Sequence, residues 1–442
     1  MRNLILLPFL LLLLGCSNKA GDSYFTAQKA SAYFREMEEI CNRDNGSLWG
    51  KNLYGPVMLV ERSTRRIYAN QPDSEGLLKE KDGIYTGLYP NELITMYAPA
   101  IYGGTLYAMV PVPNEANEKR ITSWMIHVLF HCMQISNGSK HLIFNHTNMD
   151  EDETRLWMKL EWKALKKAVN STGTERNTAI RDALVFRCTS REFYSQYSDE
   201  SNMFETYEGL ATFTDFRLNS STDEEYKTRL TEFLEWIYNM PSYASLYGNI
   251  TGALYASLLY DAGYNLQNIQ TGSVDLGKLV CEVYKIELPH ICRDVAGSLA
   301  LCYDLPVIMT EEKERMSAIQ ERLHKLTATF TDRAVVYLEL EDPSFDFEPE
   351  DSQPVDSLGT LYNSMRVSDN WGKLAVDKGG CLVSGNFRFL RVTAKGFRTE
   401  KNRISGEGWN LMLNNGWELV KVESNYFLRH ILPITGYAGY KP

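Results

Sequence analysis

The chain has 442 residues and a formal net charge of −10, from 46 lysine and arginine residues against 56 aspartate and glutamate residues. This length predicts two or three domains, each with enough apolar side chains to bury a core. The acidic balance argues against a nucleic-acid-binding protein, because such a protein is expected to present a basic face to the phosphate backbone.

The first sixteen residues resemble the signal of a bacterial lipoprotein. An apolar run too short for a permanent membrane span ends in the sequence LLGC, whose last residue is Cys16. The resemblance implies cleavage before Cys16 and acylation of that residue, which would anchor the protein in the membrane. Ser17 follows the cysteine, so the resemblance also implies the outer membrane. A cleaved secretory signal with an incidental cysteine is the alternative.

No apolar run after Cys16 reaches the roughly 18 residues that a membrane-spanning helix needs. The rest of the chain is therefore expected to form a body outside the bilayer on a lipid tether. Among the later cysteines, Cys281, Cys292 and Cys302 are close enough in sequence for one pair to form a disulfide in an oxidising compartment. Buried thiols explain these three residues equally well.

The segment before residue 120 is expected to contain one helix and a small sheet. Apolar residues recur at helical spacing over 23–42, which predicts an amphipathic helix. Residues 56–69 predict two strands joined by a turn, and 104–112 predicts a third strand. Because the third strand leads into the next apolar segment, a helix in that segment is expected to pack against the sheet.

That segment, ITSWMIHVLFHCMQ at 121–134, contains His127 and His131 four residues apart in a helical pattern. About 3.6 residues per turn bring both imidazoles onto one face of the helix. Zinc metallopeptidases hold two protein ligands in this way, and in the usual HExxH form a glutamate after the first histidine activates the attacking water. Val128 occupies that position here.

A third ligand is required, because zinc sites use three or four protein groups. From residue 121 to about 325 the apolar spacing is mostly helical. Within this region, the segment ETYEGLATF at 205–213 combines glutamate with glycine and small residues, which would let its helix approach the histidine helix closely. Glu208 is therefore our preferred third ligand.

Residues 56–262, with these motifs, resemble the gluzincins. These are zinc metallopeptidases in which one helix carries HExxH and a later helix carries the third ligand in a segment of the form (N)EGxAxY; Phe213 stands where tyrosine is more usual. The resemblance implies that His127, His131 and Glu208 bind Zn²⁺ and that a peptide or protein is the substrate. Glu161 is the alternative third ligand, because its separation from the histidines fits some members of the class.

The resemblance also implies that Val128 replaces the catalytic glutamate. Loss of such a base typically lowers the rate by about 10² to 10⁴. Peptide hydrolysis at an ordinary rate is therefore not expected unless another carboxylate, such as Glu205 or Glu161, reaches the water. A non-catalytic binding or structural lipoprotein on the same scaffold is the alternative function. In that case the two histidines are either hydrogen-bonded core residues or ligands of a structural metal.

Several polar residues have simpler explanations than metal binding. His141 and His146 lie in a polar segment at a spacing that does not stack them on a helix, so we expect them in a loop. The acidic cluster at 150–153 is expected to begin a helix, where negative charge is favourable. A charged helix over 311–325 is expected to end the helical body.

The remainder, 326–442, is predicted to form a β domain. Period-two patterns at 334–340, 372–376, 387–393, 410–413 and 417–422 predict a β-sandwich or a small barrel. Residues 341–354 are expected to be a loop, and the sequence NNG at 414–416 predicts a hairpin between the last two strands. The predicted fold is α+β: a zincin-like, mainly helical body over 17–325 with a small N-terminal sheet, followed by this domain.

Overall fold

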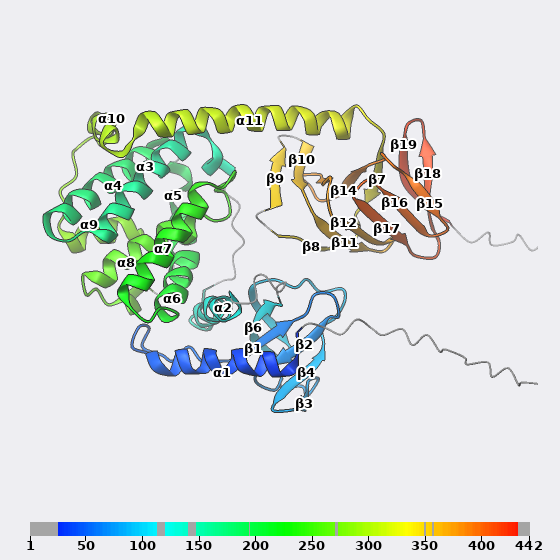
Figure 1. Cartoon of the computed structure of the whole chain (residues 1–442), viewed down its shortest axis with the longest axis horizontal. Helices are drawn as coiled ribbons and strands as arrows, with labels where there is room; N and C mark the ends of the chain where they lie inside the picture. Colours follow the sequence, from blue (N-terminus) through cyan, green and yellow to red (C-terminus); the bar gives the residue numbers. More distant parts are fainter. Residues whose placement is uncertain are drawn as a thin grey trace, which may run out of the picture.

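The computed structural model describes residues 25–112, 120–139, 147–193, 195–269, 273–348, 351–355 and 358–431. Cys16, His141 and His146 lie outside these residues, so the interpretations of all three stay predictions. The fold is α+β, as predicted, with a helical body, an N-terminal sheet and a C-terminal domain of two sheets (Figure 1). None of the helices in the described ranges is long and apolar enough to cross a bilayer.

The N-terminal sheet has six strands in the order β3-β4-β2-β1-β6-β5. Strands β1 and β6 are parallel, and the other neighbours are antiparallel. The sequence pattern does not reveal β3, β4 and β5, because few of their side chains are buried and they do not alternate cleanly. The elements are α1 (Ala27–Asp44), β1 (Val57–Val60), β2 (Arg66–Ala69), β3 (Lys79–Lys81), β4 (Ile84–Leu88), β5 (Ala98–Tyr102) and β6 (Thr105–Pro111).

The helical body begins with the histidine helix, α2 (Ile121–Ser136), which packs against β6, as predicted, and against α6. One apolar core joins α1, the sheet and the helices of the body. The predicted helix start at the acidic cluster is also present, since Asp152 and Glu153 lie in the first turn of α3. The further helices are α3 (Asp152–Asn170), α4 (Gly173–Phe193), α5 (Ser198–Phe204), α6 (Leu210–Leu218), α7 (Asp223–Tyr238), α8 (Tyr247–Asp261), α9 (Leu276–Tyr284) and α10 (Arg293–Ala300).

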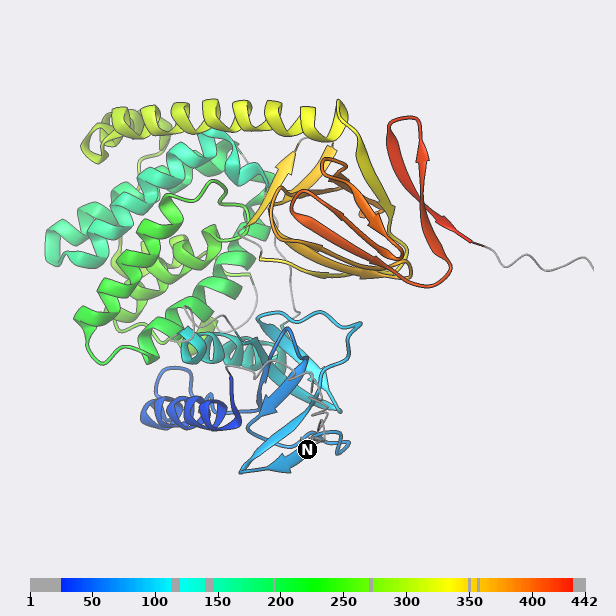
Figure 2. The ribbon, with the colours of Figure 1, turned by 45° about the vertical axis from the view of Figure 1, so that its right-hand side comes forward.

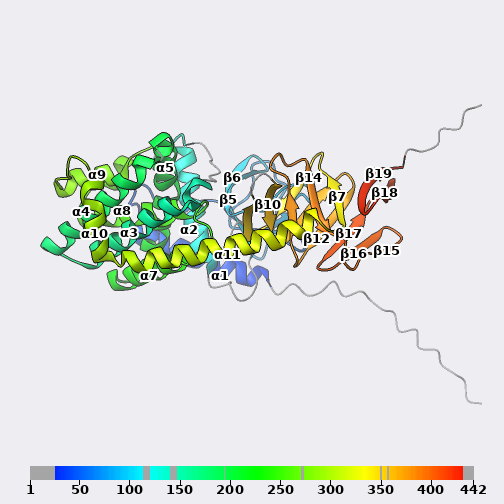
Figure 3. The same cartoon turned by 90° about the horizontal axis from the view of Figure 1, so that it is seen from above.

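Helix α11 (Leu305–Thr331) connects the helical body to the C-terminal domain and runs along both (Figure 3). It is longer at both ends than the predicted helix over 311–325. The predicted domain boundary at residue 325 falls inside α11, and the first strand of the C-terminal domain begins at Val335. The end of α11 contributes Phe330 to a second, smaller core on one sheet of that domain.

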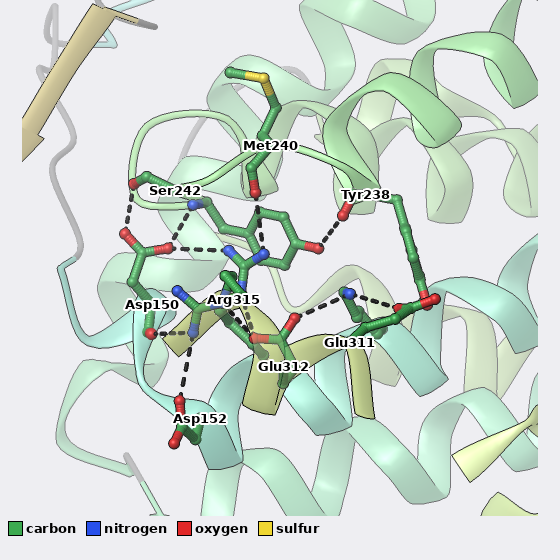
Figure 4. Close-up of polar contacts among 11 residues, drawn as sticks. Asp150, Asp152, Tyr238, Met240, Ser242, Glu311, Glu312 and Arg315 are labelled. Carbon is green, nitrogen blue, oxygen red and sulfur yellow. Dashed lines mark hydrogen bonds and ion pairs between the residues drawn. The ribbon is translucent and has the colours of Figure 1, made fainter. Parts of the chain in front are cut away.

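A buried ionic network fixes α11 to the body (Figure 4). Glu312 accepts hydrogen bonds from Arg155 Nε at 3.0 Å and Arg315 Nε at 2.5 Å, and its other oxygen lies 2.9 Å from Lys159 Nζ. Arg155 also donates to Asp150 at 3.2 Å and to the carbonyl oxygen of Met240 at 3.1 Å. Because these charges are buried and paired with one another, removal of one partner would leave an uncompensated buried charge at the joint between α3 and α11.

The C-terminal domain consists of a seven-stranded sheet, β18-β19-β7-β14-β13-β10-β9, and a six-stranded sheet, β15-β16-β17-β12-β11-β8. Both sheets contribute side chains to one core, and neither closes into a barrel within the described strands, so the sandwich alternative holds and the barrel does not. The strands are β7 (Val335–Glu339), β8 (Ser344–Asp346), β9 (Ser352–Val355), β10 (Gly359–Tyr362), β11 (Met365–Asp369), β12 (Gly372–Val376), β13 (Cys381–Val383), β14 (Phe389–Thr393), β15 (Arg398–Glu400), β16 (Arg403–Gly406), β17 (Trp409–Leu413), β18 (Trp417–Val422) and β19 (Asn425–His430).

Two predictions for this domain were wrong. The turn at 414–416 does not close a hairpin, because β17 pairs with β12 and β16 in one sheet while β18 pairs with β19 in the other. The turn therefore carries the chain between sheets. The expected loop at 341–354 contains two short strands, β8 and β9, whose side chains are mostly half-buried.

Candidate metal centre

Two histidines and one glutamate converge between α2 and the segment before α6. The Nε2 atoms of His127 and His131 are 3.1 Å apart. Oε2 of Glu208 lies 3.3 Å from the first of these nitrogens and 3.5 Å from the second. Among the described residues, these three form the one group of histidine, cysteine and acidic side chains whose ligand atoms gather at a common point.

Glu208 lies in a single π-helical turn, η4 (Glu205–Gly209), between α5 and α6. A π-turn inserts one extra residue into a helix and re-aims the side chains around it, and such turns are frequent at functional sites. The turn sits directly on α8, where a Cβ on Gly209 would overlap the backbone of Gly252. The two glycines therefore permit a backbone contact that places Glu208 opposite the histidine helix.

The separations of the three ligand atoms fit a tetrahedral zinc ion. Zinc bonds of about 2.0–2.1 Å at the tetrahedral angle separate two ligand atoms by roughly 3.3 Å. The three separations here, between 3.1 and 3.5 Å, lie around that value. Two imidazoles and one carboxylate are also a donor set that zinc accepts, with a fourth position left for another ligand.

Gln134 fixes the tautomer and the orientation of His131. Its Nε2 donates to the carbonyl oxygen of Tyr207 at 3.2 Å, which turns its Oε1 toward His131 Nδ1 at 2.8 Å. Because an amide oxygen only accepts, the proton of the neutral ring is on Nδ1 and the Nε2 lone pair faces Glu208 and His127. A hydrogen bond of this kind orients histidine ligands in metal sites.

The carboxylate of Glu208 is also held in place. Asn249, on α8, donates to Glu208 Oε2 and to Thr212 Oγ1, each at 3.2 Å. Burial disfavours the charged carboxylate, but the positive charge that His131 and His127 carry when protonated, together with their hydrogen bonds, outweighs it, so the pKa of Glu208 lies well below its usual range. The carboxylate is therefore ionised at neutral pH, as metal binding requires.

One side of the site is open to solvent. The side chains of His127 and Glu208 are 18% and 21% exposed to solvent, whereas that of His131 is 4% exposed. The ring of Tyr207 covers His131, with the two ring centroids 4.3 Å apart and nearly parallel. The His127 and Glu208 side is therefore the more exposed side of the cluster.

Asp215, on α6, is a further acid on the His127 side of the site. Its carboxylate accepts a hydrogen bond from Ser123 Oγ at 2.5 Å and another from Asn219 at 3.0 Å. Burial raises the pKa of Asp215, and the nearby charges of Arg229 and His127 oppose that effect. The sequence offered no pattern that singled out Asp215 or Asn249, because both act from other helices. Gln134 lies on the histidine helix, three residues after His131, and that spacing was the available signal.

The carboxylates considered as substitute bases lie elsewhere. Arg187 donates to both oxygens of Glu205, at 2.9 and 2.5 Å, and to Glu161 at 3.3 Å. Tyr255 also donates to Glu161 at 2.7 Å, and its ring is fully buried. The structure therefore brings Glu208, and not Glu161, to the histidines, and it binds Glu205 and Glu161 in a separate ionic cluster.

Val128, at the position of the usual catalytic glutamate, is fully buried in the core of the body. The three cysteines considered for a disulfide, Cys281, Cys292 and Cys302, all have free thiols. Comparison of the chain with models of known families, with curated proteins and with solved structures finds no match.

Proposed function

We propose that this chain binds one zinc ion on His127, His131 and Glu208 and is a metallopeptidase-like protein with impaired peptide hydrolysis. The observation that carries the proposal is the convergence of the three ligand atoms at separations that suit tetrahedral zinc. When bound, zinc would polarise a peptide carbonyl and lower the pKa of a nearby water.

The proton transfer is the step that this chain supports poorly. Hydrolysis requires a group that takes a proton from the water and delivers it to the leaving amine. Val128 has no such group, and Glu205 and Glu161 are bound by Arg187. The residues of the site are therefore equipped to bind and orient a peptide carbonyl, and we expect cleavage to be slow or absent.

The second candidate is a non-catalytic binding or structural protein on the same scaffold. The burial of Val128 favours it, because a side chain packed in the core contributes to stability rather than to chemistry. In this form, zinc holds α2 and η4 together and the open side of the site binds a partner without cleaving it.

We also propose that the protein is a lipoprotein of the bacterial envelope, anchored through Cys16, in the outer membrane. Metabolic labelling with a palmitate analogue should mark the wild type and should not mark Cys16→Ser. Labelling of both proteins would show that the lipid, if present, is elsewhere.

Metal analysis of the purified protein tests the zinc site. We expect one equivalent of zinc in the wild type and less than a tenth of that in His131→Ala, since two remaining ligands hold zinc poorly. A wild type that contains no zinc after exposure to excess metal would end the proposal. Equal zinc in both proteins would place the ion elsewhere.

Val128→Glu separates the two functions. If the site retains the geometry for hydrolysis, this variant should gain chelator-sensitive peptidase activity of about 10² or more over the wild type. Val128→Gln is the matched control, because it has the same size and cannot act as a base. Both variants place a polar group in a packed region, so their melting temperatures are measured alongside. A folded Val128→Glu without activity favours the binding protein, and chelator-sensitive cleavage by the wild type would show that no general base is missing.

A further inference from the structure

A cavity of about 670 Å³ separates the N-terminal sheet from the C-terminal domain. Figure 2 shows these two parts facing each other, away from the helices of the body. One wall is the six-stranded sheet β15-β16-β17-β12-β11-β8, and the other is formed by the turn between β1 and β2 and by the segment after β4. The volume lies in the range of ligand sites, about 300–1,000 Å³. We call this cavity the interdomain groove.

The sheet wall of the groove is the outward face of the sandwich. Val367, Leu374 and Leu411 point into the domain core, and the residues that alternate with them point into the groove. An outward face of an antiparallel sheet usually meets bulk water. Here it faces a second part of the same chain, so its side chains, although exposed, line a partly enclosed space.

The lining of the groove is basic although the chain as a whole is acidic. It contains two carboxylates, Asp346 and Glu400, and six cations: Arg62, Arg65, Arg366, Lys373, Arg398 and Arg403. Six positive charges against two negative charges leave an excess of four in a protein with a net charge of −10. A local excess of positive charge in a partly enclosed space strengthens the positive electrostatic potential there and attracts anions.

Three of the four cations on the sheet wall make no ion pair within the described part of the chain, although Glu400 aligns with Arg403 across strands β15 and β16. Arg65, on the other wall, donates to the carbonyl oxygens of Pro90 and Leu93. None of the ion pairs among the described residues involves Lys373, Arg398 or Arg403. Lys373 and Arg403 both align with Met412, one from each neighbouring strand, so they lie two strand spacings apart, about 10 Å. Two cations at this separation, with an apolar side chain between them, match a ligand that has more than one anionic group.

Arg62 holds the two walls together. Its guanidinium pairs with Asp346 at 3.6 Å and with Glu348 at 2.6 Å on the C-terminal side, and it lies over the ring of Tyr97 at 6.0 Å on its own side. Arg62 is therefore occupied by Asp346 and Glu348, whereas Lys373, Arg398 and Arg403 on the sheet wall make no ion pair with the described residues and are available to another molecule.

The groove also offers apolar surface. Leu93 and Ile94 on one wall and Met412 on the other are 45%, 37% and 45% exposed. Among the described residues, Phe345 is the one aromatic residue in the lining, and its ring packs against Phe387 at 5.9 Å. Sugar ligands typically stack on an open aromatic face, and this lining does not provide one. A peptide supplies carboxylates and apolar side chains together.

We infer that the interdomain groove binds an extended acidic peptide segment whose carboxylates pair with Lys373, Arg398 and Arg403 on the sheet wall and whose apolar side chains contact Leu93 and Ile94 on the facing wall. The inference does not rest on the metal centre. The ligand is a segment of a partner protein, recognised by alternating acidic and apolar residues, because in an extended chain these point to opposite sides.

Fluorescence anisotropy with a labelled peptide of about eight alternating glutamate and leucine residues tests the inference on the full-length protein, in the presence of a chelator. We expect saturable binding to the wild type that weakens in about 1 M salt, because salt screens charge pairs. Lys373→Glu with Arg403→Glu should raise the Kd by roughly tenfold or more. The control, Lys313→Glu with Lys421→Glu, makes the same change in net charge outside the groove and should leave the Kd within about twofold.

Several outcomes would overturn the inference. These are no saturation by about 1 mM peptide, equal binding of a lysine–leucine peptide, or equal loss of affinity in both double variants. Binding of an oligogalacturonate in preference to the peptide would replace the peptide with an acidic glycan. If the groove variant fails to fold, as judged by its melting temperature, Lys373→Ala with Arg403→Ala serves instead, with a smaller expected loss in the same direction. The use of a chelator keeps these outcomes separate from failure of the zinc proposal.

Discussion

The carbonyl oxygen of Glu205 occupies the space where a side chain on Gly252 would begin. Gly252→Ala would therefore force η4 away from α8 and move Glu208, which lies in the same turn. We expect a loss of at least about 3 kcal/mol in the free energy of unfolding, at the upper end of overpacking effects, together with weaker zinc binding. Urea unfolding and isothermal titration with zinc measure the two effects.

Gly297→Ala is the control for this variant. Gly297 lies in helix α10 with open space around it, so an added methyl group should be neutral or should stabilise the protein by up to about 1 kcal/mol. An equal loss of stability in both variants would contradict the close contact between η4 and α8.

Removal of the hydrogen bond to His131 should weaken zinc binding without removing a ligand. Gln134→Leu keeps the volume of the side chain but frees His131 to adopt the other tautomer or to turn. Loss of such a partner typically lowers metal affinity by about 10- to 100-fold. Titration with a competing chromophoric chelator measures the change. Ser136→Ala, on the exposed face of the same helix, should bind zinc as the wild type does, and an unchanged affinity in Gln134→Leu would exclude the role assigned to Gln134.

The ionic network under α11 should make the protein sensitive to acid. Burial alone would raise the pKa of Glu312, but Arg155, Lys159 and Arg315 outweigh it, so the pKa lies below its ordinary value. A carboxyl group whose pKa is lower in the folded than in the unfolded protein stabilises the fold at any pH above its unfolded-state pKa, which is about 4.3 for glutamate. This stabilisation is lost as the pH falls through the pKa of the group in the folded protein. Glu312→Gln should therefore be less stable than the wild type by about 3 kcal/mol at pH 7, and the difference should shrink in acid.

Urea unfolding at neutral and acidic pH, followed by tryptophan fluorescence, measures this dependence. Glu321→Gln is the matched control on the same helix, because the Glu321 side chain is exposed and its one ion pair among the described residues is with Lys325, four residues on. We expect no measurable loss in the control. A difference between wild type and Glu312→Gln that stays constant with pH would show that the charge of Glu312 is not the cause.

Zinc should stabilise the folded protein by mass action. At a free concentration about 100 times the Kd, binding to the folded state alone adds about 2.7 kcal/mol, which a rise in melting temperature reports. In Glu208→Gln the amide is a poorer ligand than the carboxylate, so the same zinc concentration should give a much smaller rise. Equal shifts in the two proteins would mean that zinc stabilises the fold through other groups.

The two histidines could be placed from the sequence because one helical repeat determines their geometry. Their four-residue spacing on an apolar segment puts both rings on one face, and the structure has them there. Glu208 was predicted from local composition, and its segment does reach the histidines, although the π-turn that carries it was not evident. Asn249 and Asp215 could not be identified, because they join the site through packing between helices that are distant in sequence.

In the C-terminal domain, the period-two pattern correctly predicted most strands but could not assign them to sheets. A short turn containing glycine can close a hairpin or can connect strands of two different sheets. At 414–416 the turn connects two sheets, because β17 pairs with β16 rather than with β18. Similarly, α11 extends to Thr331 because Phe330 packs on the next domain, a contact that helix periodicity does not report.

Helix α11 also bridges the helical body and the C-terminal domain. Its 27 residues span about 40 Å, with one end locked into α3 and the other seated on the sandwich. The ion pairs of Arg62 with Asp346 and Glu348 lie on the opposite side of the C-terminal domain, so the domain is contacted at two well-separated points. A rotation of the domain relative to the body would have to bend α11 or break these ion pairs. These two contacts on opposite sides of the domain set the distance between the two walls of the interdomain groove in this structure.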